Sequence, residues 1–152
     1  MKKILSLLFS ALILSSFSLA ASAAETDQVV EYLADGSYFV TEIENESPGI
    51  SLFSSSVTKS KTRTHYSASG SAQWYVKVTG TFTYGDDSSK CTSASVSARS
   101  YVSNWSISSK SSSKSGNKAT ATATADQLVQ GQVLRSVTDS VTLTCSSTGV
   151  FS

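Results

Sequence analysis

The sequence lacks most of the residues from which enzyme active sites are built. It contains one histidine, one proline and two cysteines in 152 residues. Nucleophilic triads combine a serine or cysteine with a histidine and an acid, and no G-x-S-x-G motif is present. Two S-x-x-K matches at residues 111–118 lie in a serine-rich run and have no K-T-G partner. A general base needs a positioned partner, so we interpret His65 as a surface residue on a charged edge strand.

Signals of a metal, phosphate or nucleotide site are also missing. No Cys/His cluster has zinc-ligand spacing, and no phosphate-binding loop occurs. Asp86 and Asp87 fall in a predicted turn, where the backbone favours aspartate, and calcium needs six or more oxygen ligands. We therefore predict a protein without a cofactor, a metal site, a nucleic-acid partner or enzymatic activity.

The first 23 residues have the composition of a secretory signal peptide. Two lysines precede an apolar run at residues 4–14, and a small-residue stretch ends in an A-x-A site at residues 21–23. The apolar run is shorter than the ~20 residues of a membrane-spanning helix, and no second run follows. We expect a signal helix removed after Ala23 or Ala24, and a mature protein that is secreted without a membrane anchor.

Both cysteines lie in the mature chain, which has the length of one domain. An even pair of cysteines in an oxidising compartment predicts a disulfide between Cys91 and Cys145. In the chain-entropy model, closing a loop of this length stabilises the fold by roughly 4 kcal/mol. Two reduced, buried thiols are the alternative.

Charge divides the mature chain in two. Residues 24–56 hold seven acids and no lysine or arginine, whereas residues 57–152 hold ten basic and four acidic residues. We therefore separate an acidic N-terminal segment (24–56), with one strand and a linker, from a β-sandwich domain (57–152). The acidic segment is either a solvated leader or lies against the basic domain as a pro-segment or an edge strand.

Alternation of apolar and polar residues predicts antiparallel strands along the whole mature chain. The longest alternation is 72–84, where Trp74, Val76 and Val78 share one face, and we expect it to bend at Gly80 and serve both sheets. Further strands are expected at residues 37–43, 57–67, 92–102, 104–110, 118–128 and 133–145. The second of these reads as a charged edge strand. Cys91 is out of phase with its strand, so it either precedes the strand or is followed by a bulge.

The strand at 118–128 alternates alanine with threonine, which favours a strand over a helix because threonine is a poor helix former. A flat alanine face leaves room for bulky side chains on the opposite sheet. We therefore predict an all-β, antiparallel β-sandwich in which Trp74 packs toward the alanine strand.

Two resemblances support a β fold. Cys91, Trp105 and Cys145 resemble the Cys…Trp…Cys spacing of immunoglobulin-like sandwiches, with Asp139 six residues before the second cysteine. Leu143 stands where that fold has the tyrosine of its tyrosine corner.

The second resemblance covers most of the mature chain. It rests on the order of DGSYFVTEIE, a K/T-rich strand, WYVKVTGTFTY, a first cysteine, SSKSSSKSGNKATATATA and VTLTC. This order resembles uncharacterised small secreted proteins of Gram-positive, clostridia-type bacteria. The resemblance implies secretion and a β fold, and it implies no activity and no catalytic residue.

Exposed tyrosines are the candidates for a binding surface. Tyr75 and Lys77 lie on the polar face of the long strand, and with Tyr66 and Tyr101 they are candidates for an aromatic platform for sugar or peptidoglycan. Tyrosines scattered over a sheet are the alternative. We predict a secreted, non-enzymatic protein that binds a cell-wall polymer or glycan at a bacterial envelope. A secreted toxin or bacteriocin-like protein with an acidic pro-segment is the alternative, and a hydrolase with an unrecognised site is a third hypothesis.

Overall fold

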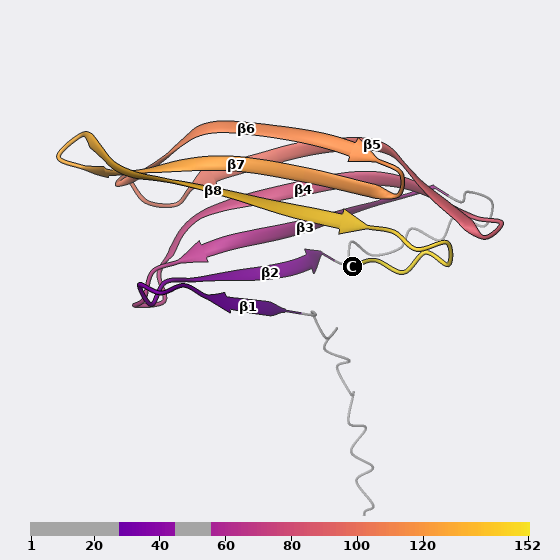
Figure 1. The fold of residues 1–152 in the computed structure, drawn as a ribbon, viewed down its shortest axis with the longest axis horizontal. Coiled ribbons are helices and arrows are strands. Elements are labelled where there is room, and N and C mark those ends of the chain that lie inside the picture. Colours follow the sequence, from indigo (N-terminus) through magenta and orange to yellow (C-terminus); the bar gives the residue numbers. More distant parts are fainter. Residues whose placement is uncertain (1–27, 45–55) are drawn as a thin grey trace, which may run out of the picture.

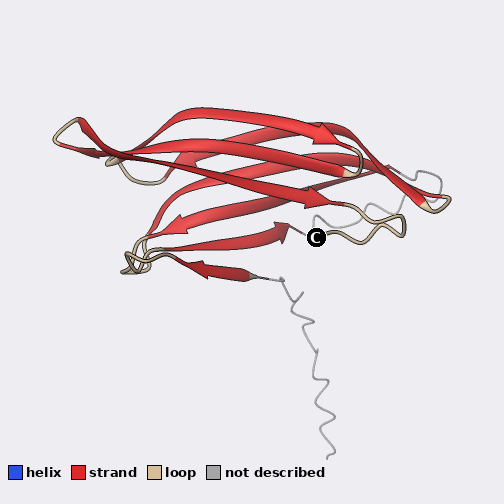
Figure 2. Cartoon of the chain, in the orientation of Figure 1, coloured by secondary structure: helices blue, strands red, loops and turns tan. Residues whose placement is uncertain are grey.

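The computed structural model describes residues 28–44 and 56–152, which form an all-β fold (Figures 1 and 2). Its strands are β1 (Val29–Tyr32), β2 (Tyr38–Glu44), β3 (Ser56–Tyr66), β4 (Ala72–Gly85), β5 (Ser88–Ser100), β6 (Trp105–Ser115), β7 (Lys118–Val129) and β8 (Gln132–Thr144). The described residues contain no helix, and so none that could cross a membrane. The predicted signal helix (1–23) and nearly all of the predicted linker lie outside the described residues.

The strands form two antiparallel sheets that pack face to face. The strand order is β1-β2-β3-β4-β5 in the first sheet and β6-β7-β8 in the second, so paired strands are always neighbours in sequence. The predicted all-β, antiparallel architecture is thus confirmed. Immunoglobulin sheets instead combine strands ABED and CFG, so that resemblance does not extend to the topology. The prediction of an edge strand at 57–67 was wrong, because β3 lies between β2 and β4.

One core joins the two sheets. The inward side chains of β4 alternate as predicted and are fully buried, and four alanines of β7 face them from the second sheet. Trp74 of β4 and Trp105 of β6 meet with ring centroids 6.2 Å apart. The small alanine side chains let the sheets approach closely, which is how facing sheets interdigitate. The buried apolar residues are Phe39, Trp74, Val76, Val78, Phe82, Cys91, Trp105, Ala119, Ala121, Ala123, Ala125, Val141, Leu143 and Cys145.

Gly80 has a different role from the predicted one. The pairing of β3 with β4 runs through Gly80 without a register shift, and β4 belongs to one sheet only. A Cβ at Gly80 would lie 2.9 Å from Ala119 Cβ and 2.5 Å from a ring carbon of Phe82. Glycine is therefore needed here because the two sheets come close together, and β4 does not serve both sheets.

A bulge follows Cys91, which confirms one of the two predicted explanations for its being out of phase with its strand. Thr81 pairs with Ser93 and Phe82 pairs with Cys91, so Thr92 is the extra residue on β5. The bulge rotates Cys91 inward, which explains why it is out of phase with the rest of its strand.

The predicted disulfide between Cys91 and Cys145 was wrong, since both cysteines are free and buried. The backbone N–H of Cys91 donates to Gly116 O (2.8 Å), and that of Cys145 donates to Asn117 O (3.1 Å). The β6–β7 turn therefore lies between the two cysteines and keeps them apart. Burial raises the pKa of both thiols, which keeps them protonated.

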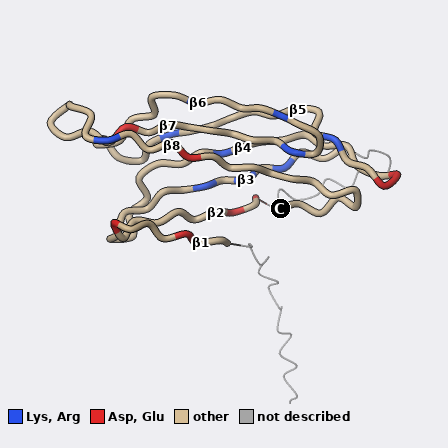
Figure 3. The backbone as a smooth tube through the Cα atoms, in the orientation of Figure 1, with Lys and Arg blue, Asp and Glu red and all other residues tan. Residues whose placement is uncertain are grey.

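Residues 29–44 of the acidic segment are part of the first sheet. They form two strands instead of the predicted one, and β2 pairs with β3 along its full length. Phe39 of this segment packs in the hydrophobic core. Acidic residues of the segment, coloured red in Figure 3, form three ion pairs with basic residues of the body, coloured blue: Glu31–Arg63 (2.8 Å), Glu44–Lys77 (2.5 Å) and Asp35–Arg135 (3.0 Å). The boundary at 56/57 thus separates no independent units.

Candidate functional site

Five tyrosines gather on the outer face of the first sheet. Three of them face outward because side chains alternate between the two faces of a strand and each is next to a buried residue. Tyr38 precedes Phe39, Tyr66 follows His65, and Tyr75 follows Trp74. Tyr32 pairs with Tyr38, which pairs with Tyr66, and the fifth, Tyr101, directly follows β5. We call this group, Tyr32, Tyr38, Tyr66, Tyr75 and Tyr101, the tyrosine band.

Ring contacts join the tyrosines of the band in two groups, one of three rings and one of two. The rings of Tyr38 and Tyr66 are stacked, with centroids 5.1 Å apart and an interplanar angle of 6°. Tyr32 lies 5.4 Å from Tyr38, and Tyr75 lies 5.5 Å from Tyr101. The pKa of Tyr101 is raised, first by burial and then by the neighbouring phenols of Tyr75 and Tyr66. Tyr32 and Tyr101 remain 74% and 55% exposed, so the band is open to solvent.

A polar hollow of about 300 Å³ adjoins the band. Its lining consists of Glu44, Thr62, Tyr75, Lys77, Arg99 and Tyr101. Lys77 and Thr62 both donate to the carboxylate of Glu44, at 2.5 and 3.0 Å. Burial opposes ionisation of Glu44, but these two donors outweigh it and hold the pKa of Glu44 below its ordinary value. The hollow therefore presents fixed charges beside aromatic rings.

The four residues predicted as a binding surface do come together. Tyr75, Lys77 and Tyr101 line the same hollow, and Tyr66 belongs to the same band. The sequence reasoning missed Tyr32 and Tyr38, which lie on paired strands on either side of the turn that contains Asp35 and Gly36. It also missed Glu44 and Arg99, which pairing brings to the same face from β2 and β5.

His65 is not the surface residue that we predicted. It is 2% exposed and lies among the rings of Phe39, Trp74 and Trp105, with centroids 4.9, 5.9 and 5.4 Å away. Neither ring nitrogen has a hydrogen-bond partner among the described residues. Burial lowers the pKa of His65, and the positive charge of Arg135 lowers it further, so the imidazole is neutral at pH 7.

The imidazole lines a second hollow, of about 150 Å³. We call it the His65 pocket, and its lining consists of Asp35, Ser37, His65, Ser67, Ala68, Gln73, Trp105, Gln127 and Arg135. At its exposed rim, Arg135 donates to Asp35 (3.0 Å) and to Gln127 (2.7 Å), and its guanidinium lies 5.7 Å from the centroid of Trp105. Hydrogen bonds from Ser37 and then Arg135 hold the pKa of Asp35 at about 2.

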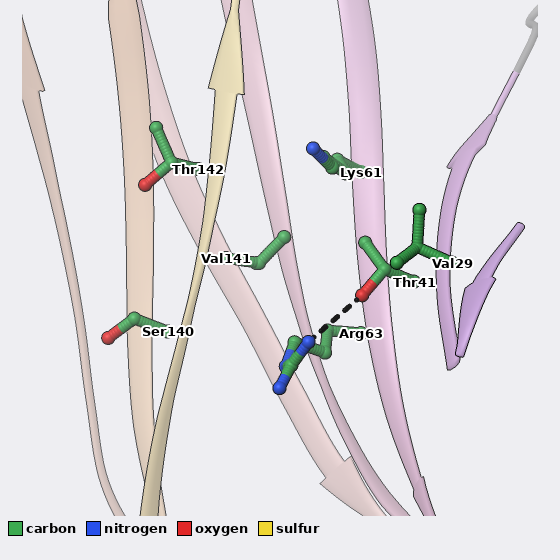
Figure 4. Close-up of a pocket in the computed structure, with 7 residues that line it drawn as sticks. All are labelled: Val29, Thr41, Lys61, Arg63, Ser140, Val141 and Thr142. Atoms are coloured by element: carbon green, nitrogen blue, oxygen red, sulfur yellow. Dashed lines mark hydrogen bonds between the residues drawn. The ribbon is translucent and has the colours of Figure 1, made fainter. Parts of the chain in front are cut away.

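A third hollow, of about 230 Å³, lies between β8 and strands β1 to β3 (Figure 4). Its main polar group is Arg63, which donates to Thr41 (3.2 Å), Glu31 (2.8 Å) and Asp139 (2.5 Å). Burial lowers the pKa of Arg63, but the two carboxylates outweigh it and raise the pKa above its ordinary value. Because the charge of Arg63 is already paired, we assign Arg63 a structural role: its side chain contacts β1, β2 and β8 and connects them.

Within the described part of the chain, no group of three or more His, Cys, Asp or Glu side chains could hold a metal ion. Comparison with known proteins gives no family: no protein-family model matches the chain, and neither a curated protein nor a solved structure is similar to it. The resemblance to small secreted proteins of clostridia-type bacteria therefore stays a prediction.

Proposed function

We propose that the protein is a secreted, non-enzymatic glycan-binding protein that attaches to a cell-wall polymer through the tyrosine band. The observation that carries the proposal is the clustering of five of the chain's six tyrosines on one face of one sheet. Tyrosine offers an apolar ring and a polar hydroxyl, so it suits a ligand whose faces are apolar and whose edges carry hydroxyls. A sugar ring has this character.

The groups around the band fit the edges of such a ligand. Glu44, Lys77 and Arg99 lie beside Tyr75 and Tyr101 in one hollow. Charged groups form the stronger hydrogen bonds, and Lys77 and Glu44 hold each other in place before a ligand arrives. The band crosses neighbouring strands, whose ~4.8 Å separation suits a chain of sugar rings lying across the sheet.

The toxin hypothesis with a removable acidic pro-segment is less consistent with the packing. Cleavage near Ser56 would take away β1 and β2, and with them Phe39. His65 and Trp74, which Phe39 covers, would lose that contact. The mature form would also lose Tyr32 and Tyr38, two members of the band. Intact-mass analysis of the secreted protein separates the hypotheses, since we expect a chain that begins at Ala24 or Glu25.

The function is tested by co-sedimentation of the purified mature protein with insoluble polysaccharides and with peptidoglycan. We expect retention on at least one polymer, and loss of that retention in the double variant Tyr75→Ala/Tyr101→Ala. Val150→Ala is the matched control, because it shortens an exposed apolar side chain near the C-terminus, outside the band. Full retention of the double variant, or no binding of the wild-type protein to any polymer, would refute the proposal.

A further inference from the structure

The His65 pocket contains a buried group with unused hydrogen-bonding capacity. A neutral imidazole has one donor and one acceptor, and both are without a partner among the described residues. A buried polar group almost always has a hydrogen-bond partner, so one that has none in the protein normally faces a water or a ligand. Here the imidazole lines a hollow with room for several water molecules at ~30 Å³ each.

The charges of the pocket select for a neutral guest. Asp35 and Arg135 are paired at the rim, and His65 at the floor is uncharged, so the lining has no net charge to offer an ion. An anion would have to compete with Asp35 for Arg135, and a cation would have to compete with Arg135 for Asp35.

The other polar side chains of the pocket offer a ligand both hydrogen-bond donors and hydrogen-bond acceptors. Gln73 uses its amide nitrogen on Ser71 O, which leaves its amide oxygen as an acceptor. Gln127 accepts from Arg135 through its amide oxygen, which leaves its amide nitrogen as a donor. With the imidazole, the pocket thus presents a mixed set of donors and acceptors beside the flat ring of Trp105. A hydroxyl group donates and accepts at once, so a compact molecule with several hydroxyls matches the set.

From these features we infer that the His65 pocket is a second binding site, for a single monosaccharide-sized, uncharged polyol. It lies between the sheets, whereas the tyrosine band lies on the outer face, so the two sites are separate. The inference does not depend on the tyrosine band binding a glycan. Its residues come from both sheets and from the β1–β2 and β3–β4 turns, so a guest would bridge parts of the chain that are distant in sequence.

Tryptophan fluorescence reports on this site alone. The chain has two tryptophans, Trp74 and Trp105, and both contact His65, whereas the band contains only tyrosines. We expect a saturable change in tryptophan emission when glucose or N-acetylglucosamine is titrated into the mature protein, and no such change with sodium acetate. Tyr75→Ala/Tyr101→Ala should respond as the wild type does, even if it no longer sediments with polymer.

His65→Leu is the decisive variant, because it removes both nitrogens and keeps an apolar side chain in an aromatic surrounding. We expect it to fold and to bind the monosaccharide about tenfold more weakly, the loss that corresponds to one neutral hydrogen bond. Gln127→Ala, at the rim, should weaken binding without disturbing the core. An emission change that neither variant alters, an equal response to acetate, or a pocket that holds water only would overturn the inference.

Discussion

Gly80→Ala tests how closely the two sheets approach. The added Cβ would lie 2.5 and 2.8 Å from two ring carbons of Phe82 and 2.9 Å from Ala119 Cβ. Both neighbours are fully buried, so neither can move into solvent. Overpacking of this kind costs about 1–3 kcal/mol, and alanine recovers roughly 0.5–1 kcal/mol by restricting the unfolded chain. The net destabilisation should be roughly 1–2 kcal/mol.

The effect is measured by thermal and urea unfolding followed by circular dichroism. For a mature chain of this length, 1 kcal/mol corresponds to about 4 °C in Tm, so a fall of about 4–8 °C is expected. The double variant Gly80→Ala/Ala119→Gly removes one of the clashing methyl groups and should recover part of the loss, giving a coupling of at least ~0.5 kcal/mol. A Gly80→Ala protein as stable as the wild type would show that the sheets are farther apart than described.

Three further predictions concern the core. Phe39→Ala should destabilise the fold by about 3–5 kcal/mol in urea unfolding, because a buried ring is lost; a loss below ~1 kcal/mol would mean that β2 is not packed in the core. The pKa of His65 is lowered in the fold, so the unfolded chain binds the extra proton, and stability should fall as pH drops below about 6.5. His65→Leu should lack this fall in stability. The lowered pKa values of Asp35 and Glu44 affect stability only below about pH 4.5, so they do not contribute to a change near pH 6.5. Iodoacetamide should label neither cysteine in the native protein and both in urea without reductant, whereas a chain unlabelled in urea would contain a disulfide.

The sequence predicted local features of the fold well, because the alternation of apolar and polar residues can be recognised within a single strand. The strands around Trp74 and Ala121 were found close to their observed bounds. β1 was missed because four exposed residues show no buried face. The serine-rich stretch that ends at Ser115 was left outside the predicted strand at 104–110, yet it continues β6, since pairing with β7 supplies the hydrogen bonds that its composition does not signal.

Features that depend on strand pairing were predicted poorly. The charges on β3 suggested an edge, but Arg63 is half-buried against acids of β1 and β8, which lie far away in sequence. His65 was assigned to the surface because its neighbours in sequence are polar, whereas its neighbours in space are three aromatic rings. The candidate binding residues were found because tyrosines opposite a buried face must point outward, although their contacts with one another became visible only in the structure.

The most direct test of the tyrosine band is a comparison of affinities for the polymer that the mature protein retains. Two aromatic contacts contribute roughly 1–3 kcal/mol beyond their buried area, so Tyr75→Ala/Tyr101→Ala should raise Kd by about 10- to 100-fold. Tyr75→Phe keeps the ring and should stay within about threefold of the wild type. A double variant that binds as tightly as the wild type, while Val150→Ala also leaves Kd unchanged, would contradict glycan binding at the tyrosine band.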